Sequence, residues 1–261
     1  MYRMYRTLAV IGTETVMIIS LKEGERLDDL HRSNYKIIQN PCYFSFGMDA
    51  VLLASFADIH KNEKHLDICC GNGVVPILLA ARHPAASFCG IEIQQELAEM
   101  AMRSVAFNGL ENKISIVNGD LKNAANFFPA SSFDAMTANP PYAAPGSGLE
   151  NISKEMAIAR HEIACTLDDV CACASKMLRF GGRFYMVHRP TRLADIIVAM
   201  RKNNLEPKTL RFVQPRTDAP PNTMLIMAAK GGKPQLNIQP PLVVYGADGK
   251  YTPEVKGIYY D

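Results

Sequence analysis

The short sequence Asn139-Pro140-Pro141-Tyr142 carries the side chains best suited to chemistry in this chain. It follows an apolar run, residues 133–138, that is typical of a buried strand in a parallel sheet. Because each proline fixes φ and holds the preceding residue extended, the Asn139 amide and nearby carbonyls are expected to face the cleft at the carboxyl end of that strand. An amide oxygen and a carbonyl can accept both protons of an amino group, and a tyrosine ring can stack on a planar base. The pattern predicts a site for a flat molecule that carries an NH2 group; the alternative is a Pro-Pro loop that only ends a strand.

A glycine turn upstream indicates a bound cofactor. Residues 64–70 have the pattern of a strand, Gly71-Asn72-Gly73 follows, and residues 74–83 have the pattern of a helix. Glycines let the backbone approach a ligand, which then faces the N-terminus of the helix. Pro76 occupies the place of the third glycine of the dinucleotide motif, and the turn lacks the Lys-Ser/Thr pair of a phosphate loop. The turn therefore predicts a cofactor without a pyrophosphate and disfavours a dehydrogenase.

Two acidic residues stand at the ends of the next predicted strands. Glu92 ends the strand predicted at residues 88–92, and Asp120 follows the strand predicted at residues 114–118. A carboxylate at Glu92 can accept hydrogen bonds from both ribose hydroxyls of an adenosine, and one at Asp120 can accept a hydrogen bond from the adenine amino group. For Glu92 the alternative is a surface residue at a strand end.

Length and composition indicate the class of protein. The 261 residues are 48% hydrophobic and 21% charged, which is ordinary for one globular α/β domain. No apolar stretch reaches the roughly 18 residues of a membrane span, so no membrane partner is expected. The seven cysteines form no C-x-x-C pair and no disulfide framework, which favours a reducing cytoplasm and no metal site.

Basic residues concentrate toward the C-terminus. Residues 176–233 contain 12 Lys and Arg against 3 Asp and Glu, a net charge of +9 in a chain whose total is +2. This segment favours a polyanionic substrate, although a solvated basic face is an equal alternative. The candidates for holding a nucleic-acid backbone are Arg179, Arg183, Arg189, Arg192, Arg201, Lys202, Lys208, Arg211 and Arg216.

Alternating strand and helix patterns predict a mostly parallel sheet within one main domain. We expect residues 1–20 to be an N-terminal extension, either non-native or disordered, with Met17 as an alternative start. Residues 21–261 are expected to form a single domain with a cap segment (21–62) and a C-terminal tail (231–261). The Gly/Ser/Pro-rich residues 143–151 are a candidate lid.

The chain resembles class I S-adenosylmethionine-dependent methyltransferases in the order and spacing of Asp67, Gly71, Gly73, Glu92, Asp120 and Asn139-Pro140-Pro141-Tyr142. The resemblance implies a Rossmann-like α/β fold with a seven-stranded, mostly parallel sheet, helices on both faces and an antiparallel strand near the C-terminus. It also implies S-adenosyl-L-methionine as the cofactor. The Asn-Pro-Pro-Tyr element is similar to that of the branch that methylates amino groups of bases or glutamine amides.

A closer similarity is to the bacterial valine-tRNA adenine-N6 methyltransferases. It is carried by residues 26–30, 36–41 and 46–53, by Ala159-Arg160-His161-Glu162, and by Val244-Tyr245 with residues 248–252. Met48 stands where that family more often has threonine, and about the first 16 residues have no counterpart. The similarity implies a tRNA partner and methylation at N6 of the adenosine 3′ of the anticodon. The oligomeric state stays open between a monomer and a weak dimer. Methylation of rRNA or of a glutamine amide, and a non-catalytic cofactor-binding module, stay open as alternatives.

The resemblance also implies roles for individual residues. Asn139, Pro140 and Tyr142 are expected to be catalytic. The expected cofactor-binding residues are Phe46, Asp49, Asp67, Cys69, Gly71, Gly73, Glu92, Ile93, Asp120, Leu121 and Asn139. The expected substrate-binding residues are Pro141, Tyr142, Arg160, His161, Arg189, Arg192 and Arg216. For Arg160 and His161, helix capping or ion pairing is the alternative role.

Overall fold

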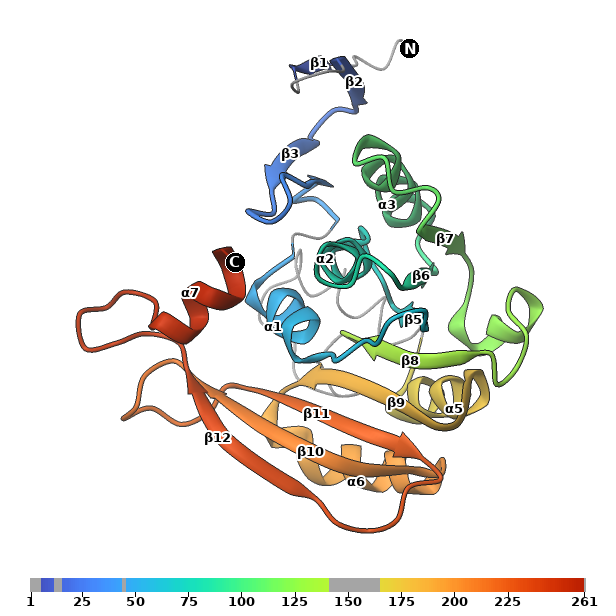
Figure 1. Ribbon diagram of the computed structural model, residues 1–261, viewed down its shortest axis with the longest axis vertical. Helices are drawn as coiled ribbons and strands as arrows, with labels where there is room; N and C mark the ends of the chain where they lie inside the picture. The colour runs from blue at the N-terminus through green and yellow to red at the C-terminus, as the bar shows by residue number, and fades with distance from the viewer. Residues whose placement is uncertain (1–5, 12–15, 44–45, 141–164, 261) are drawn as a thin grey trace.

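The computed structural model describes residues 6–11, 16–43, 46–140 and 165–260. Over these residues the chain forms a layered α/β structure around one large sheet, with the strand order β12-β10-β11-β9-β8-β5-β6-β7 (Figure 1). These strands are β5 (Lys64–Ile68), β6 (Ser87–Glu92), β7 (Ile114–Asn118), β8 (Phe133–Ala138), β9 (Leu178–His188), β10 (Leu205–Gln214), β11 (Thr223–Lys230) and β12 (Asn237–Val243). Neighbouring strands are parallel except where β11 pairs with β9 and β10. The predicted fold class is confirmed.

The main sheet differs from the prediction by one strand. In the described part of the chain it has eight strands, and the additional one, β12, pairs in parallel with β10 at the edge. The prolines Pro240 and Pro241 within β12 argue against a strand when only the sequence is considered. An edge strand tolerates them because only one of its sides pairs with a neighbour.

Helices cover both faces of the sheet. One face carries α1 (Met48–Phe56), α2 (Val74–Arg82) and α3 (Gln95–Phe107), and the other carries α5 (Leu167–Met177) and α6 (Leu193–Lys202) (Figure 1). Two short 3-10 turns are η1 (Leu121–Asn126) and η2 (Pro190–Arg192), and α7 (Pro253–Tyr260) packs on α1. A hydrophobic core lies on each face of the sheet, and strand β8 contributes side chains to both. Ala135 packs with α1 and α2 on one face, whereas Met136 packs with α5 and α6 on the other. Burial on both faces explains why β8 reads as a continuous apolar run.

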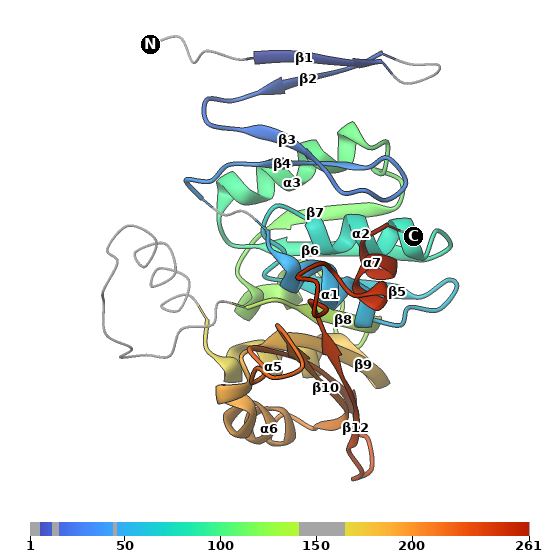
Figure 2. The ribbon, with the colours of Figure 1, turned by 90° about the vertical axis from the view of Figure 1, so that its left-hand side faces the viewer.

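The N-terminal segments form two antiparallel hairpins. Strands β1 (Arg6–Ile11) and β2 (Val16–Leu21) pair with each other, as do β3 (Arg26–Asp29) and β4 (Lys36–Gln39). Figure 2 shows β1 and β2 at one end of the molecule, beyond β3, and β4 alongside α3. Within the described ranges, no helix is long and apolar enough to cross a lipid bilayer.

Polar side chains of α3 and of the glycine turn fix β4 to the domain. The backbone of Lys36 exchanges two hydrogen bonds with the side chain of Asn108, and the Ile38 N–H donates to Oγ of Ser104 at 3.0 Å. The Asn72 amide, inside the glycine turn, donates to the Ile38 carbonyl at 3.1 Å. The cap segment therefore lies directly against the turn predicted to bind the cofactor.

Candidate active site

The glycine turn leaves the carboxyl end of β5 with an unusual backbone. Gly71 and Gly73 have φ of 54° and 84°, and Cys69 adopts the same left-handed region with φ of 60°. Gly73 begins α2, and a Cβ on it would come within 3.0 Å of the Cβ of Ala101 in α3. A side chain at this position would therefore push the turn away from α3, so the glycine is required for both conformation and space.

The carboxylate of Glu92, at the end of β6, is held by backbone donors. Its Oε2 accepts a hydrogen bond from the Gly71 N–H at 2.9 Å, and its Oε1 accepts one from the Gln94 N–H at 3.0 Å. The side chain is buried. Because an ionised carboxylate has about four lone-pair positions, both oxygens keep capacity for further donors. The arrangement fixes an anionic acceptor beside the glycine turn.

A narrow pocket adjoins Glu92. It is lined by Cys69, Ile91, Glu92, Ile93, Gly119, Asp120, Leu121 and Cys165. Asp120 caps η1 by accepting a hydrogen bond from the Lys122 N–H at 2.9 Å. The free volume of this pocket is about 20 Å³, which has room for about one water molecule.

Two thiols meet in this pocket. Cys69 and Cys165 are hydrogen-bonded to each other. This bond is the largest influence on both groups: it lowers the pKa of the Cys165 thiol and, together with burial, raises the pKa of the Cys69 thiol. Cys165, which lies two residues before the start of α5, thus forms one side of the pocket.

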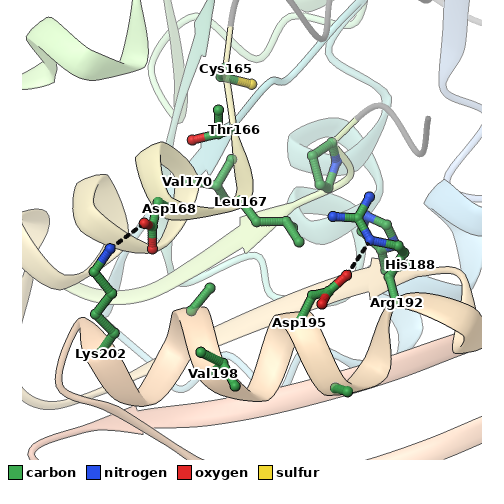
Figure 3. Close-up of a pocket in the computed structure, with 13 residues that line it drawn as sticks. Cys165, Thr166, Leu167, Asp168, Val170, His188, Arg192, Asp195, Val198 and Lys202 are labelled. Atoms are coloured by element: carbon green, nitrogen blue, oxygen red, sulfur yellow. Dashed lines mark hydrogen bonds and ion pairs between the residues drawn. The ribbon is translucent and has the colours of Figure 1, made fainter. Parts of the chain in front are cut away.

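A larger cavity, of about 550 Å³, begins at Pro140. It lies between α5 and α6, with apolar walls that include Leu167, Val170 and Val198. Figure 3 shows two ion pairs at its margins, Arg192 with Asp195 and Lys202 with Asp168. Cys165 lines this cavity as well as the narrow pocket, so the two spaces share a wall.

His188 ends β9 within the larger cavity. Its Nδ1 accepts a hydrogen bond from the Arg189 N–H at 2.8 Å, which leaves the proton of the neutral ring on Nε2. Burial lowers the pKa of His188 to about 4, and the neighbouring Arg192 contributes to the shift. The ring is therefore neutral at physiological pH.

Several residues that the sequence predicts for the site are brought together. Cys69, Glu92, Ile93, Asp120 and Leu121 line the narrow pocket, and Gly71 contacts it through Glu92. Ala138 pairs with Ile68, so Asn139 and Cys69 leave neighbouring strands at the same edge of the sheet. Pro140 and Arg192 line the adjoining cavity.

Other predicted residues lie elsewhere. Phe46 packs against the core beneath α1, and Asp49 accepts a hydrogen bond from the Thr223 hydroxyl at 3.3 Å, so neither lines the two spaces just described. Arg189 donates to the Asn222 carbonyl at 3.0 Å, and Arg216 lies on the loop after β10. Pro141, Tyr142, Arg160, His161 and the candidate lid lie outside the described residues.

The basic residues are less available than their number suggests. Of the nine candidates for holding a nucleic acid, seven are in ion pairs, formed by Arg179, Arg183, Arg192, Arg201, Lys202, Arg211 and Arg216. Arg183, for example, pairs with Glu63 at 2.5 Å. The acidic partners come from outside the basic segment in four of these pairs, so its local net charge overstates the positive field.

Sequence reasoning missed Thr137, His188 and Cys165. Thr137 contacts Asp67 from the neighbouring strand, and no sequence pattern reports such a pairing. His188 could have been found, because it is a polar residue directly after the buried run of β9. In the part of the chain that the structure describes, no group of three or more His, Cys, Asp or Glu side chains could hold a metal ion.

Comparison with known proteins gives the family. The model of the methyltransferase small domain matches residues 34–203, well over half of the chain. The tRNA1(Val) (adenine(37)-N6)-methyltransferase of Aeromonas salmonicida is 27% identical over 224 residues, covering 84% of this chain and 89% of that protein. The enzyme of the same name from Porphyromonas gingivalis is 28% identical over 228 residues, with the same two coverages of 84% and 89%.

Solved structures agree with this match. A predicted O-methyltransferase from Agrobacterium tumefaciens superposes with a TM-score of 0.68 at 25% identity, covering 81% of this chain and 95% of that one. The geranyl diphosphate C-methyltransferase of Streptomyces coelicolor, solved with S-adenosyl-L-homocysteine, shares the fold with a TM-score of 0.54 at 14% identity, covering 70% of this chain and 80% of that one. The chain therefore belongs to the methyltransferase small domain family, and it is an enzyme.

Proposed function

We propose that the protein transfers a methyl group to N6 of an adenosine in tRNA, the adenosine 3′ of the anticodon of a valine tRNA. The observation that carries this proposal is the position of Asn139-Pro140. These residues directly follow β8, next to the glycine turn that follows β5, and Pro140 lines a cavity of about 550 Å³. The names of the relatives from Aeromonas salmonicida and Porphyromonas gingivalis support tRNA as the substrate and a cytoplasmic site of action.

The residues of the narrow pocket fit S-adenosyl-L-methionine. The anchored carboxylate of Glu92 can accept hydrogen bonds from the ribose hydroxyls, and Asp120 can accept one from the adenine amino group. Ile93 and Leu121 supply apolar surface for a flat ring. The shared wall at Cys165 puts this pocket next to the cavity at Pro140, as transfer between two bound molecules requires.

The chain's own residues act mainly by positioning in this mechanism. The Asn139 side chain and the Pro140 carbonyl accept the two N–H groups of the adenine amine, which directs its lone pair out of the ring plane. Tyr142 stacks on the base and holds it there. When bound, the cofactor supplies a methyl group on a cationic sulfur, so its transfer requires no strong base. Orientation of this kind can supply roughly 7–11 kcal/mol.

The cavity between α5 and α6 accepts the target base in this proposal. Its volume of about 550 Å³ lies within the usual range for small-molecule sites, and its walls are mainly apolar. Among the described residues, Arg192 and Lys202 at its margins pair with the exposed carboxylates of Asp195 and Asp168, so they can turn to phosphates at little cost. An adenosine in an anticodon loop is unpaired, so placing it in a pocket costs less than extracting a base from a duplex.

The test is methyl transfer to RNA. The protein is incubated with methyl-labelled cofactor and total tRNA from a bacterial strain that lacks the gene, and the nucleosides are analysed by mass spectrometry. New N6-methyladenosine is expected. Label in rRNA or in protein glutamine would retain the enzyme class and refute the tRNA substrate. Cofactor binding without label in any fraction would indicate a binding module.

A single variant tests the assigned chemistry. Asn139→Ala is expected to abolish transfer while leaving cofactor affinity within a few-fold of wild type, because the amide contacts the substrate amine. Calorimetry that finds cofactor binding lost in this variant would contradict the role given to Asn139.

A further inference from the structure

The C-terminal tail carries a row of stacked tyrosines. The rings of Tyr245 and Tyr251 have centroids 5.3 Å apart and planes inclined by 26°. Tyr251 and Tyr259 continue the row at 5.5 Å and 16°, and Tyr260 follows Tyr259 at 6.0 Å. The row ends against His31, whose ring centroid is 5.6 Å from that of Tyr260. We refer to Tyr245, Tyr251, Tyr259 and Tyr260 as the tyrosine row.

The tyrosine row begins at the same edge of the sheet as Asn139. Strands β12 and β8 run in the same direction, and Tyr245 follows β12 as Asn139 follows β8. Four strand spacings separate β12 from β8, which corresponds to about 19 Å along this edge. Figure 1 shows α7 and the loop before it on the side toward which β8 points. The start of the row and the site of chemistry therefore lie at the same edge of the sheet.

The first ring of the row is open to solvent. Tyr245 is 38% exposed, whereas Tyr251 behind it is half-buried. An exposed tyrosine ring at the end of a stack suits a planar base. The backbone N–H of Tyr245 donates to the Pro215 carbonyl at 2.9 Å, which places the Tyr245 backbone beside the loop that carries Arg216.

Arg216 adds a positive charge that can be redirected. Among the described residues it forms an ion pair with Asp218 at 3.5 Å, and the two side chains are 67% and 82% exposed. An ion pair this exposed contributes little, so exchanging the carboxylate for a phosphate is inexpensive. An exposed aromatic ring together with an exposed arginine is the combination by which proteins hold single-stranded nucleic acids.

The support behind the row is rigid. Arg32 donates to the carbonyls of Gly257 and Ile258, and Arg82 donates to the Ile258 carbonyl at 2.6 Å. These bonds hold the carboxyl end of α7, where a cation also complements the helix dipole. A preorganised ring loses little conformational freedom when a base stacks on it.

We propose that Tyr245 stacks an unpaired base of the substrate RNA, outside the base that is methylated, and that Arg216 holds a neighbouring phosphate. This inference depends on the proposed RNA substrate and adds to it a second contact, about 19 Å from the reacting amine. The tyrosine row thereby helps select an RNA with an unpaired base at this distance from the target.

The experiment compares variants in RNA binding and in turnover. Tyr245→Ala is expected to raise both the Kd for labelled tRNA and the KM by about 5- to 100-fold, with kcat unchanged, because one stacked base is lost. Tyr245→Phe retains the ring and should bind as wild type does. Phe180→Ala is the matched control: this aromatic side chain is 78% exposed near the amino end of β9, at the opposite edge of the sheet.

A direct readout is tyrosine fluorescence. The chain has ten tyrosines and no tryptophan, so a base stacked on Tyr245 quenches emission that no indole obscures. A short unstructured RNA is expected to quench wild type more than Tyr245→Ala and Tyr245→Phe, because neither variant has an emitting tyrosine at this position, while Tyr245→Phe should still bind the RNA with wild-type affinity. This measurement requires no methyl transfer, so it separates the stacking contact from the catalytic assignment.

The outcomes distinguish the two proposals. Methylated tRNA together with wild-type affinity in Tyr245→Ala would overturn the stacking contact alone. Quenching by RNA without tRNA methylation would keep the contact and overturn the assigned substrate. If Tyr245→Ala lowers only the melting temperature, the row serves to anchor α7 and the stacking proposal is wrong.

Discussion

Oγ1 of Thr137 donates a hydrogen bond of 2.5 Å to Oδ1 of Asp67 inside the sheet. The two residues face each other on the parallel strands β8 and β5, and both are buried. Burial raises the pKa of Asp67 to about 8; the hydrogen bond from Thr137 opposes the rise, and the charge of Glu92 adds to it. The strand that leads into the glycine turn and the strand that leads into Asn139 are thus joined by a buried hydrogen bond to a titratable side chain.

The first prediction concerns the stability of the cofactor-free protein at alkaline pH. The ordinary pKa of the Asp67 carboxyl is 3.8, so between that pH and about 8 the folded protein holds a proton that the unfolded chain has lost. Stability therefore falls as pH rises through this interval and levels off above it. Asp67→Asn cannot ionise, so its melting temperature should not show this fall. The melting temperature of the variant minus that of wild type should therefore increase from pH 6 to pH 8. Equal pH profiles for the two proteins in thermal unfolding would contradict the prediction.

The second prediction concerns His65, a buried histidine of β5. Neither of its ring nitrogens has a hydrogen-bond partner among the described residues, and burial lowers its pKa to about 3. Replacing an unsatisfied buried polar group by an apolar one removes a desolvation cost, so His65→Leu should stabilise the protein by about 1–2 kcal/mol at pH 7.

The same variant should change the acid profile. As pH falls below 6.5 the unfolded chain protonates its histidine while folded His65 stays neutral, so wild type loses stability more steeply toward pH 4 than His65→Leu does. Urea unfolding at pH 7 and pH 5 measures both effects, with the exposed His60→Leu as the control for loss of an imidazole. A less stable His65→Leu at both pH values would mean that the ring is needed for packing against Phe88.

The third prediction concerns Glu92. In Glu92→Gln an NH2 group must replace one of the two oxygens that now accept from Gly71 and Gln94, so one backbone donor loses its partner and the ribose acceptor loses its charge. Hydrogen bonds to charged groups contribute about 1.5–3 kcal/mol, which corresponds to about a 10- to 100-fold weaker affinity for S-adenosyl-L-homocysteine in calorimetry. Glu96→Gln, in the first turn of α3, is the control and should bind normally. An affinity within two-fold of wild type for Glu92→Gln refutes the assignment.

The fourth prediction uses the two thiols of the narrow pocket. Because its hydrogen bond with Cys69 lowers the pKa of the Cys165 thiol, Cys165 should react with N-ethylmaleimide faster than an ordinary buried cysteine. The adduct occupies the pocket, so cofactor binding should be lost. Peptide mass spectrometry follows the reaction, and cofactor should protect Cys165 but not the exposed Cys42. Equal modification rates of Cys165 with and without cofactor would place the cofactor elsewhere.

The sequence by itself determined the elements whose information is local. The apolar run of β8, the glycine turn after β5, and the acidic residues at Glu92 and Asp120 were all found at the strand ends where the structure places them. Each follows from a short pattern: burial on both faces gives a continuous apolar strand, and positive φ at the turn favours glycine. The sheet topology and the solved methyltransferase structure from Agrobacterium tumefaciens confirm the predicted fold class.

The tertiary structure alone decided which residues meet across the sheet. Thr137 reaches Asp67 and Cys165 reaches Cys69 because strands and segments far apart in the chain become neighbours. The same folding neutralises much of the basic segment, as when Arg183 meets Glu63, 120 positions away. It also lets β12 join the sheet in spite of two prolines, because an edge strand needs only one row of hydrogen bonds. Contacts between distant residues depend on the packed geometry of the whole chain, and a local pattern carries no record of them.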